Sequence, residues 1–323
     1  MGYITRRKFL KYSLGAGGTA LASQFTNAKN LFGQSREKLK LNIGYLPIAD
    51  HLILPVSKGL DNGLYNYINV NPCLCQSWDE ISGKMDMGIL NAAFMLAPLA
   101  MHKVINGASM RCLLLGHTNG SVIAVNKTIT NGKDLNGKTI GIPHSKSTHR
   151  VLLYKYFKDR GMEKNINIKL VKIPPPLTIA SLKSGKIDGY CVAEPWGSQG
   201  LKAGVADILE SSHNIIPNHA CCIVMVKNRI IDKHMDGISE WVKSLINAGK
   251  FIHTNPKQAG LMQKPFMNQV PEDIAQAIKK EFISYVNIKP DKAKLDIIGK
   301  LSLECGLLHE KYNFSHFVDN RFA

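Results

Sequence analysis

The chain has 323 residues, of which 45% are hydrophobic and 20% charged, an ordinary mixture for a globular protein long enough to form two cores. No apolar run reaches about 18 residues, so a conventional transmembrane helix is not expected. The formal net charge is +17, but the basic residues are scattered without a long cluster or interleaved aromatics. This pattern favours a solvated basic surface over nucleic acid as a partner.

The N-terminus has the pattern of an export signal. Twin arginines and Phe-Leu-Lys, within residues 5–11, precede a Gly-rich apolar stretch over residues 12–22 that ends in Ala-Leu-Ala. This order resembles a bacterial twin-arginine (Tat) signal with a small-x-small cleavage site, and Ala28 is an alternative end. The other interpretation is a short amphipathic helix. We predict a signal peptide over residues 1–28, export by the Tat translocase and a periplasmic location.

The first part of the mature chain predicts strands and helices in alternation. The expected strands cover residues 38–46, 68–75, 87–91, 113–117 and 121–126, and the expected helices cover residues 52–59, 78–84 and 92–106. Strands are indicated by apolar runs or alternating polarity, and helices by their spacing and their Gly stops. Because parallel strands need crossover helices, this order favours parallel α/β packing.

The same alternation returns further along the chain and then gives way to helices. The expected strands cover residues 138–142, 168–173, 187–192 and 221–226, and the expected helices cover residues 149–160, 177–183, 239–254, 256–262, 272–286 and 292–305. We predict an α/β fold with two lobes, of the periplasmic-binding-protein type (type II), and a ligand cleft at the hinge. Lobe one would contain residues 39–125 and 221–323, and lobe two residues 127–219. The strands over 121–126 and 221–226 would cross between them.

Polar and aromatic side chains follow several of the expected strands, where open α/β sheets bind ligands. The ligand-binding candidates are Asp50, His51, Trp78, Asn91, Ala92, Ser145, Ser147, Thr148, Glu194, Trp196 and His219. For His51 the alternative is a residue at a helix entry, for Trp78 a core side chain, and for Glu194 a structural pair across the hinge. A carboxylate at position 194 would suit an ammonium, amidine or hydroxyl group and would repel a bare oxyanion.

Two groups of candidates lie at expected helix starts. Asn91 and Ala92 would offer backbone amides to an anion. Ser145, Ser147 and Thr148 add hydroxyls that would accept a carboxylate, sulfonate or phosphate, and ordinary N-capping is the alternative. His149 and Arg150 would add donors nearby, whereas Lys146 is expected to face solvent.

The seven cysteines are too few for a disulfide scaffold, and their odd number leaves at least one free thiol unless another chain supplies a partner. Neither Cys73 with Cys75 nor Cys221 with Cys222 has the spacing of zinc ligands. We interpret the cysteines as small buried side chains and expect no metal site and no cofactor.

No catalytic motif stands out, since the sequence lacks Gly-x-Ser-x-Gly, His-Glu-x-x-His and the P-loop pattern. His219 and Cys221 would share one face of a strand and could form a thiol–base pair. We favour a buried thiol instead, because the apolar strand offers no accessible, electropositive setting. We expect no enzymatic activity.

Several segments together resemble one known family, the nitrate/sulfonate/bicarbonate-binding proteins of ABC importers. The segments are Gly44–His51, Ser77 with Trp78, Asn91–Pro98, Ile173–Pro176, Ile187–Trp196 and Phe317–Asp319. They are similar, in order and spacing, to the family's first loop, tryptophan loop, Met-Leu-Ala-Pro helix, triple proline and Glu-Pro-Trp loop. The resemblance spans nearly the whole mature chain and is strongest to the nitrate and bicarbonate binders. It implies a monomeric extracytoplasmic protein that delivers a small anion or small polar organic molecule to a membrane permease.

The chain also departs from the family's pattern. Asn91 and Phe94 stand where the family often has Asp and His, and Cys222 stands where nitrate-type members have a lysine that contacts an oxyanion. These departures argue against nitrate and bicarbonate as ligands.

Two other functions remain open. The first is a ligand sensor with the same fold, and the second is binding or synthesis of a thiamine pyrimidine precursor by a protein of similar fold. The second would use a cleft rich in His and Cys, for which His51, His149, His219 and Cys222 are candidates.

Overall fold

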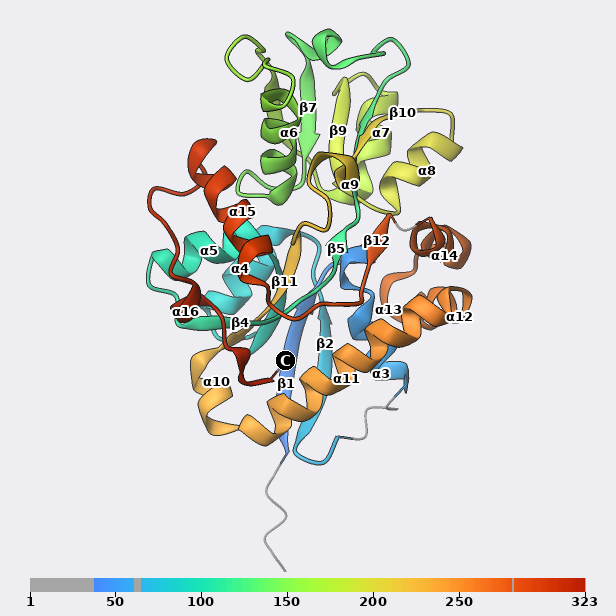
Figure 1. Ribbon diagram of the computed structural model, residues 1–323. Coiled ribbons are helices and arrows are strands. Elements are labelled where there is room, and N and C mark those ends of the chain that lie inside the picture. Colours follow the sequence, from blue (N-terminus) through green and yellow to red (C-terminus); the bar gives the residue numbers. More distant parts are fainter. Residues whose placement is uncertain (1–37, 61–64, 281, 323) are drawn as a thin grey trace, which may run out of the picture. The chain divides into compact units, whose positions relative to one another are not determined.

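The computed structural model describes residues 38–60, 65–280 and 282–322. The expected signal peptide therefore lies outside the described residues. The described chain contains two five-stranded sheets and one two-stranded sheet (Figure 1). None of the helices in the described ranges combines the length and the apolar character needed to cross a bilayer.

The first sheet is mixed, with four strands that run in one direction and one that runs against them. Its order is β2 (Ile68–Leu74), β1 (Leu39–Tyr45), β3 (Ala92–Leu96), β11 (Cys222–Lys227) and β4 (Met110–Leu115). β1 is parallel to β2 and β3, whereas β11 runs antiparallel to β3 and β4. The carboxyl ends of β1, β2 and β3 therefore share one edge of this sheet.

The second sheet repeats this mixed arrangement. Its order is β10 (Asp207–Ser211), β6 (Ser121–Val125), β9 (Gly189–Ala193), β7 (Thr139–Ile142) and β8 (Lys169–Lys172). β7, β8 and β9 are parallel, and β6 is antiparallel to β9 and β10. β6, which was expected to belong to lobe one, pairs with strands of this second sheet.

Helices cover both sheets and connect the strands. Those before β7 are η1 (Ala49–His51), α3 (Ile53–Leu60), α4 (Trp78–Asp86), α5 (Ala97–Ile105) and η2 (Gly132–Leu135). Those before β11 are α6 (Thr148–Lys158), η3 (Pro175–Leu177), α7 (Thr178–Lys183), α8 (Trp196–Lys202) and α9 (Ser212–Ile215). The tail adds α10 (Asn228–Lys233), α11 (Met235–Thr254), α12 (Pro256–Met262), α13 (Lys264–Met267), α14 (Pro271–Lys279), α15 (Lys292–Glu304), α16 (Phe314–Phe317) and η4 (Asn320–Phe322).

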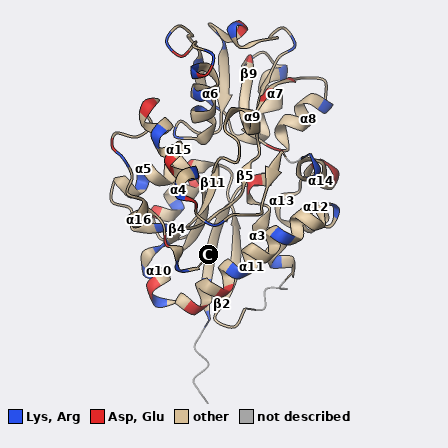
Figure 2. Cartoon of the chain, in the orientation of Figure 1, with Lys and Arg blue, Asp and Glu red and all other residues tan. Residues whose placement is uncertain are grey.

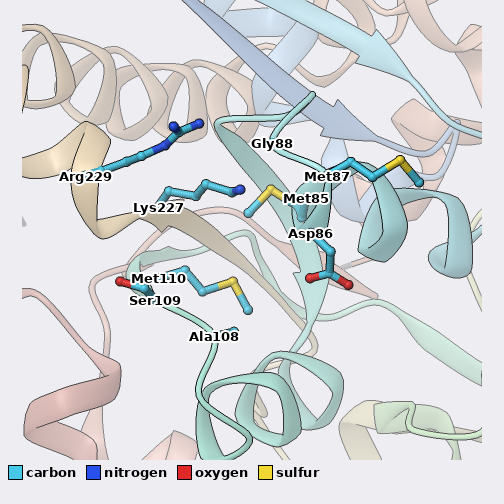
Figure 3. Close-up of a pocket in the computed structure, with 9 residues that line it drawn as sticks. All are labelled: Met85, Asp86, Met87, Gly88, Ala108, Ser109, Met110, Lys227 and Arg229. Atoms are coloured by element: carbon cyan, nitrogen blue, oxygen red, sulfur yellow. The ribbon is translucent and has the colours of Figure 1, made fainter.

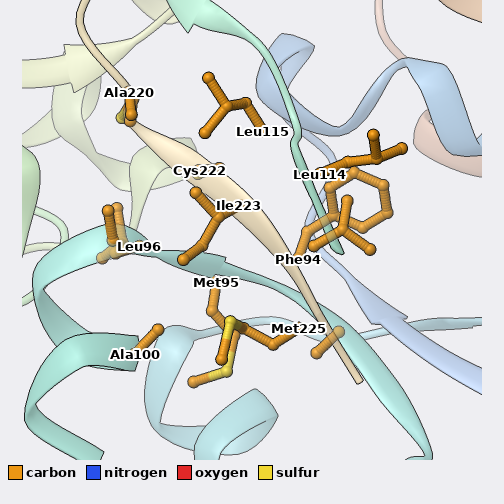
Figure 4. Packing of buried hydrophobic residues seen from close by; sticks show 14 of the residues in the cluster. Phe94, Met95, Leu96, Ala100, Leu114, Leu115, Ala220, Cys222, Ile223 and Met225 are labelled. Carbon is orange, nitrogen blue, oxygen red and sulfur yellow. The ribbon is translucent and has the colours of Figure 1, made fainter. Parts of the chain in front are cut away.

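The strands of the first sheet carry the best-packed part of the core. Every residue of β3 is buried, and its Phe94 and Met95 pack with Leu114 of β4 and with Ile223 and Met225 of β11 (Figure 4). Strands buried on both faces lack alternation, because neither face needs polar side chains. Lys and Arg are instead spread over the helices around the sheets (Figure 2).

Three expected elements differ from the structure. Ala92–Leu96 forms β3 and α5 begins only at Ala97, whereas residues 87–91 form a turn instead of the expected strand. A short apolar run does not by its pattern distinguish a strand from a buried helix. The helix expected over 272–286 stops at Lys279, and Ile283–Ser284 forms β12, which pairs with β5 (Thr118–Asn119).

The chain passes between the two large sheets at two segments that lie side by side. Asn119 and Gly120 have φ angles of 60° and 93°, in the left-handed region that Asn and Gly tolerate best. The Asn119 N–H donates to the carbonyl of His219 at 3.2 Å, and the Asn119 Oδ1 accepts from the Asn218 N–H at 2.8 Å. A bridge between Thr118 and Ala220 continues this pairing.

Candidate functional site

The first part of the candidate site follows the carboxyl ends of β1 and β2. Asp50 and His51 lie in η1 and are fully buried. The His51 Nδ1 accepts a hydrogen bond from the Leu46 N–H at 2.8 Å, so its proton is on Nε2, which has no partner. The His51 ring lies 5.4 Å from Trp78 in an edge-on contact and 5.0 Å from Phe94. Burial lowers the pKa of His51 to about 3, so its ring is neutral.

Trp78 begins α4, whose start is fixed by Ser77. The Ser77 hydroxyl accepts from the Glu80 N–H at 3.1 Å, as an N-cap does. The Trp78 side chain is 1% exposed, and its indole Nε1–H has no partner. The structure thus brings Asp50, His51 and Trp78 to one edge of the first sheet, as the sequence predicted.

Asp50 is the centre of a buried polar cluster that includes three residues from later in the chain. Its Oδ2 lies 3.2 Å from His117 Nε2, 3.4 Å from the Cys222 Sγ and 3.7 Å from the Cys221 Sγ. Burial raises the pKa of Asp50 to about 6, although His117 opposes this shift. Burial tends to lower the pKa of His117, but the negative charge of Asp50 has a larger effect in the other direction. The pKa of His117 is therefore raised to about 10.

The second sheet contributes residues from the start of α6. Ser147 is the N-cap of this helix, and its hydroxyl accepts from the Arg150 N–H at 3.3 Å. The Thr148 hydroxyl donates to the carbonyl of Cys221 at 3.3 Å, which joins α6 to the start of β11. The His149 Nε2 lies 3.1 Å from the Ser121 hydroxyl, while its Nδ1 has no partner.

Glu194 follows β9 and connects the two sheets through its backbone. Its carbonyl accepts from the Ala49 N–H at 3.0 Å, one residue before Asp50. Its carboxylate accepts from both the N–H and the hydroxyl of Ser198, each at 3.0 Å. Burial raises the pKa of Glu194, and the two bonds from Ser198 oppose that shift only in part.

Trp196 and His219 complete the group. The half-buried Trp196 has an indole Nε1–H without a partner. His219 is buried, and its Nδ1 lies 2.9 Å from the carbonyl of Ile216. Because a carbonyl only accepts, Nδ1 holds the proton, and the lone pair of Nε2 has no partner.

Most of the buried polar atoms without a partner in the described residues belong to this group. In the described part of the chain, buried atoms without a hydrogen-bond partner include Asp50 Oδ1, His51 Nε2, Trp78 Nε1, His117 Nδ1, His149 Nδ1, Trp196 Nε1 and His219 Nε2. Native proteins leave few buried polar groups unpaired, because each costs about 1–3 kcal/mol. A set of unpaired donors and acceptors from both sheets is therefore well suited to a ligand.

Three of the expected residues lie elsewhere. Asn91 and Ala92 begin β3 at the end opposite to Asp50, and the Asn91 Oδ1 accepts from the Asn42 N–H at 2.8 Å. The expected helix amides at these positions do not exist, because a strand forms there. Ser145 is exposed in the turn before α6, while Ser147 is used as a cap.

His117 was not among the candidates, and Cys221 and Cys222 were taken as core thiols. His117 comes two residues after β4, but the expected strand over residues 113–117 included it, so the rule that selected Asp50 did not select His117. No local motif indicates the cluster, because its members lie far apart in sequence.

Some hollows of the structure lie outside this group. One of about 460 Å³ is lined by Met85, Asp86, Lys227 and Arg229, among others (Figure 3). Val226, the neighbour of Lys227, pairs with Ala92, so this hollow is at the amino end of β3. It is therefore separate from the edge that carries Asp50.

Comparisons with known proteins identify the family. The model of the NMT1-like family matches residues 34–264, so the chain belongs to this family. The nitrate import ATP-binding protein NrtC of Synechocystis is 26% identical over 265 residues, which cover 75% of this chain and 39% of that protein. The taurine-binding periplasmic protein of Escherichia coli is 29% identical over 177 residues, or 54% of this chain and 53% of that protein. The chain thus spans well under two thirds of these relatives.

Solved structures show the same fold. The ligand-binding component of an ABC-type import system from Staphylococcus aureus, solved with zinc bound, superposes with a TM-score of 0.79 at 25% identity and covers 88% of this chain and 98% of that one. The periplasmic nitrate-binding protein NrtA of Synechocystis gives a TM-score of 0.77 at 17% identity, over 84% of this chain and 83% of that one. The expected periplasmic-binding-protein fold and the resemblance to nitrate- and sulfonate-type solute-binding proteins are confirmed.

Proposed function

We propose that the chain is the extracytoplasmic solute-binding component of an ABC importer and that it captures a small polar organic solute between its two large sheets. The observation that carries this proposal is the set of unpartnered polar atoms contributed by both sheets, on His51 and Trp78 from one and His149 and Trp196 from the other. The relatives include a nitrate import ATP-binding protein, a bicarbonate transport ATP-binding protein and a taurine-binding periplasmic protein, which supports the same role.

The proposal assigns the two sheets to two lobes that move about a hinge. Lobe one would comprise residues 39–117 with 221–323, and lobe two residues 121–219. The hinge would be the paired segments 118–120 and 218–220. Hinge closure around a solute shifts the population toward the closed form, which the permease would recognise. The hydrogen bond from the Ala49 N–H to the Glu194 carbonyl joins the two sheets, so it would form only in the closed form.

The chemistry of the side chains favours a solute that carries a hydrogen-bond donor. Asp50 and Glu194 are buried carboxylates, and the described part of the chain buries no Lys or Arg. A bare oxyanion would face two acids, of which only Asp50 has a cationic neighbour, His117, whereas an ammonium or amidine group would pair with the acids. The neutral rings of His51 and His149 would form hydrogen bonds with acceptor groups of the solute.

A thermal-shift screen of the mature protein tests this function. The panel should contain taurine, aliphatic sulfonates, small carboxylates, pyrimidines, nitrate and bicarbonate. A solute at 100 times its Kd stabilises the folded state by about 2.7 kcal/mol, a clear rise in Tm. We expect a response from solutes with a donor group and none from nitrate. An equal response to nitrate would contradict the assignment of the two acids to the site.

Export is proposed through the Tat translocase to the periplasm, with a monomer as the mature form and no catalytic activity. A fusion of residues 1–37 to a reporter should leave the cytoplasm of a normal strain and stay inside a strain without the Tat translocase. Replacement of Arg6 and Arg7 by Lys should slow export, whereas Lys11→Arg is the control. Export that does not depend on the Tat translocase would refute this route.

A further inference from the structure

Four buried side chains, of which the proposed function uses only Asp50, meet at one point. Asp50 follows β1, His117 follows β4, and Cys221 and Cys222 lie at the start of β11. One ligand atom from each of the four lies within 4.8 Å of all the others. All four residues are fully buried, with 0% exposure.

The distances within this cluster match those between the ligands of one metal ion. With zinc bonds of roughly 2.0 Å to oxygen and nitrogen and 2.3 Å to sulfur, a tetrahedron has edges of about 3.3 Å between oxygen and nitrogen and 3.5 Å between oxygen and sulfur. The Asp50 Oδ2 lies 3.2 Å from the His117 Nε2 and 3.4 and 3.7 Å from the two sulfur atoms. The three distances to Asp50 are therefore close to those of a tetrahedral zinc site.

Hydrogen bonds within the protein do not satisfy the cluster. The Cys222 N–H donates to the His117 Nε2 at 3.3 Å, so this nitrogen acts as an acceptor. The carboxylate of Asp50, which is also an acceptor, faces the same nitrogen. The other oxygen of Asp50 and the other nitrogen of His117 have no partner. A buried Asp–His ion pair is the alternative interpretation, and it leaves these two atoms unpaired.

The surroundings hold the two cysteines in place. The carbonyl of Cys221 accepts from the Ala97 N–H at 2.9 Å and from the Thr148 hydroxyl at 3.3 Å. His219 is beside Cys221, and its Nδ1–H donates to a backbone carbonyl while its Nε2 lone pair is free.

We propose that Asp50, His117, Cys221 and Cys222 bind one thiophilic metal ion of the zinc class. Two sulfurs, an imidazole and a carboxylate suit Zn²⁺ and do not suit Mg²⁺ or Ca²⁺, which take oxygen ligands. This proposal replaces the expectation, drawn from the spacing of the cysteines, that the protein has no metal site. Sequence spacing missed it because three segments far apart in the chain supply the ligands.

Titration with Co²⁺ tests the proposal, because Co²⁺ bound by thiolates is coloured. The mature protein, reduced with a phosphine and stripped by a chelator, should bind one Co²⁺ with tetrahedral d–d bands and a sulfur-to-metal charge-transfer band. Zn²⁺ should displace it. Cys221→Ser and Cys222→Ser should each weaken binding by about 100-fold or more, since even changes behind the ligands cost 10- to 100-fold. Cys191→Ser, a buried cysteine of β9 outside the cluster, is the matched control and should bind like the wild type.

A second measurement covers the case in which a cysteine variant fails to fold. X-ray absorption of the zinc-loaded wild-type protein should show two sulfur and two nitrogen or oxygen neighbours. The proposal is overturned if the wild type binds no stoichiometric Co²⁺, if Cys222→Ser binds as tightly as Cys191→Ser, or if the absorption spectrum shows no sulfur neighbour. These results do not depend on which solute the protein carries, so the proposed transport function can stand or fall separately.

Discussion

Trp78→Phe, paired with Trp241→Phe, is the sharpest test of the proposed solute site. Both indoles are buried, with exposures of 1% and 0%, and neither indole N–H has a partner. Each change removes on the order of 40 Å³ of side chain, which at about 24 cal/mol per Å³ costs about 1 kcal/mol. The same change removes an unpaired buried N–H, whose presence destabilises the folded state, and this gain offsets a loss of about 1 kcal/mol. Without solute, both variants should therefore unfold within about 1 kcal/mol of the wild type.

With solute the two variants should differ. If the Trp78 N–H donates to the solute, its loss costs about 1.4 kcal/mol, a tenfold increase in Kd. At a concentration of 100 times the wild-type Kd, the stabilisation by solute falls from about 2.7 to about 1.4 kcal/mol. Trp241, on α11, should keep the full stabilisation because no residue of this helix belongs to the proposed site. Thermal unfolding with and without solute measures both quantities. Equal losses in the two variants, or none in Trp78→Phe, would refute the role given to Trp78.

Two further predictions concern stability. In Gly249→Ala the new Cβ would lie 2.2 Å from the backbone oxygen of Tyr285, so the free energy of unfolding should fall by about 1–3 kcal/mol or more. In Gly83→Ala the nearest atom is 3.8 Å away, so this control should be neutral or stabilising. Denaturant titrations measure both. Glu194→Gln tests the buried acid: because its pKa is raised in the folded state, its stabilising contribution is complete below about pH 4.5 and is lost as the pH rises through the folded-state value. The Gln variant should therefore melt above the wild type near neutral pH and converge with it toward pH 4, and a gap in Tm that does not change with pH would contradict the shift.

The sequence predicted the α/β class because the strand and helix patterns are strong at most positions. β1, β7, β9 and α12 lie within a few residues of their expected bounds, since alternation, Gly stops and an N-terminal Pro mark them. The prediction of a helix over Ala92–Leu96 was wrong for a physical reason. It is a strand buried on both faces, so its composition is also that of a buried helix.

The same reasoning explains which site residues could be predicted. Asp50 and Glu194 follow strands, and the position of a strand's end can be estimated from sequence. Asn91 was misplaced because a helix was expected to begin at Ala92, where the structure has the strand β3. The cluster around Asp50 needs the pairing of β11 with β4, which brings Cys222 next to His117. Pairing between strands about 100 residues apart leaves no trace in either segment alone.

The charges of the surface and of the site act on a solute in different ways, and their effects can be separated by salt. The net charge of +17 comes from Lys and Arg, none of which is buried in the described part of the chain. Exposed charges are screened beyond about 8 Å at physiological ionic strength, whereas buried groups are screened much less. An anion held by a surface feature such as the hollow beside Lys227 should therefore bind more weakly as salt rises. A solute enclosed by Asp50, Glu194 and the buried histidines should change its Kd by less than about twofold between 50 and 500 mM NaCl, because its partners are out of reach of the ions. Calorimetric titration at both salt concentrations measures this, and a Kd that rises steeply with salt would place the solute on the basic surface.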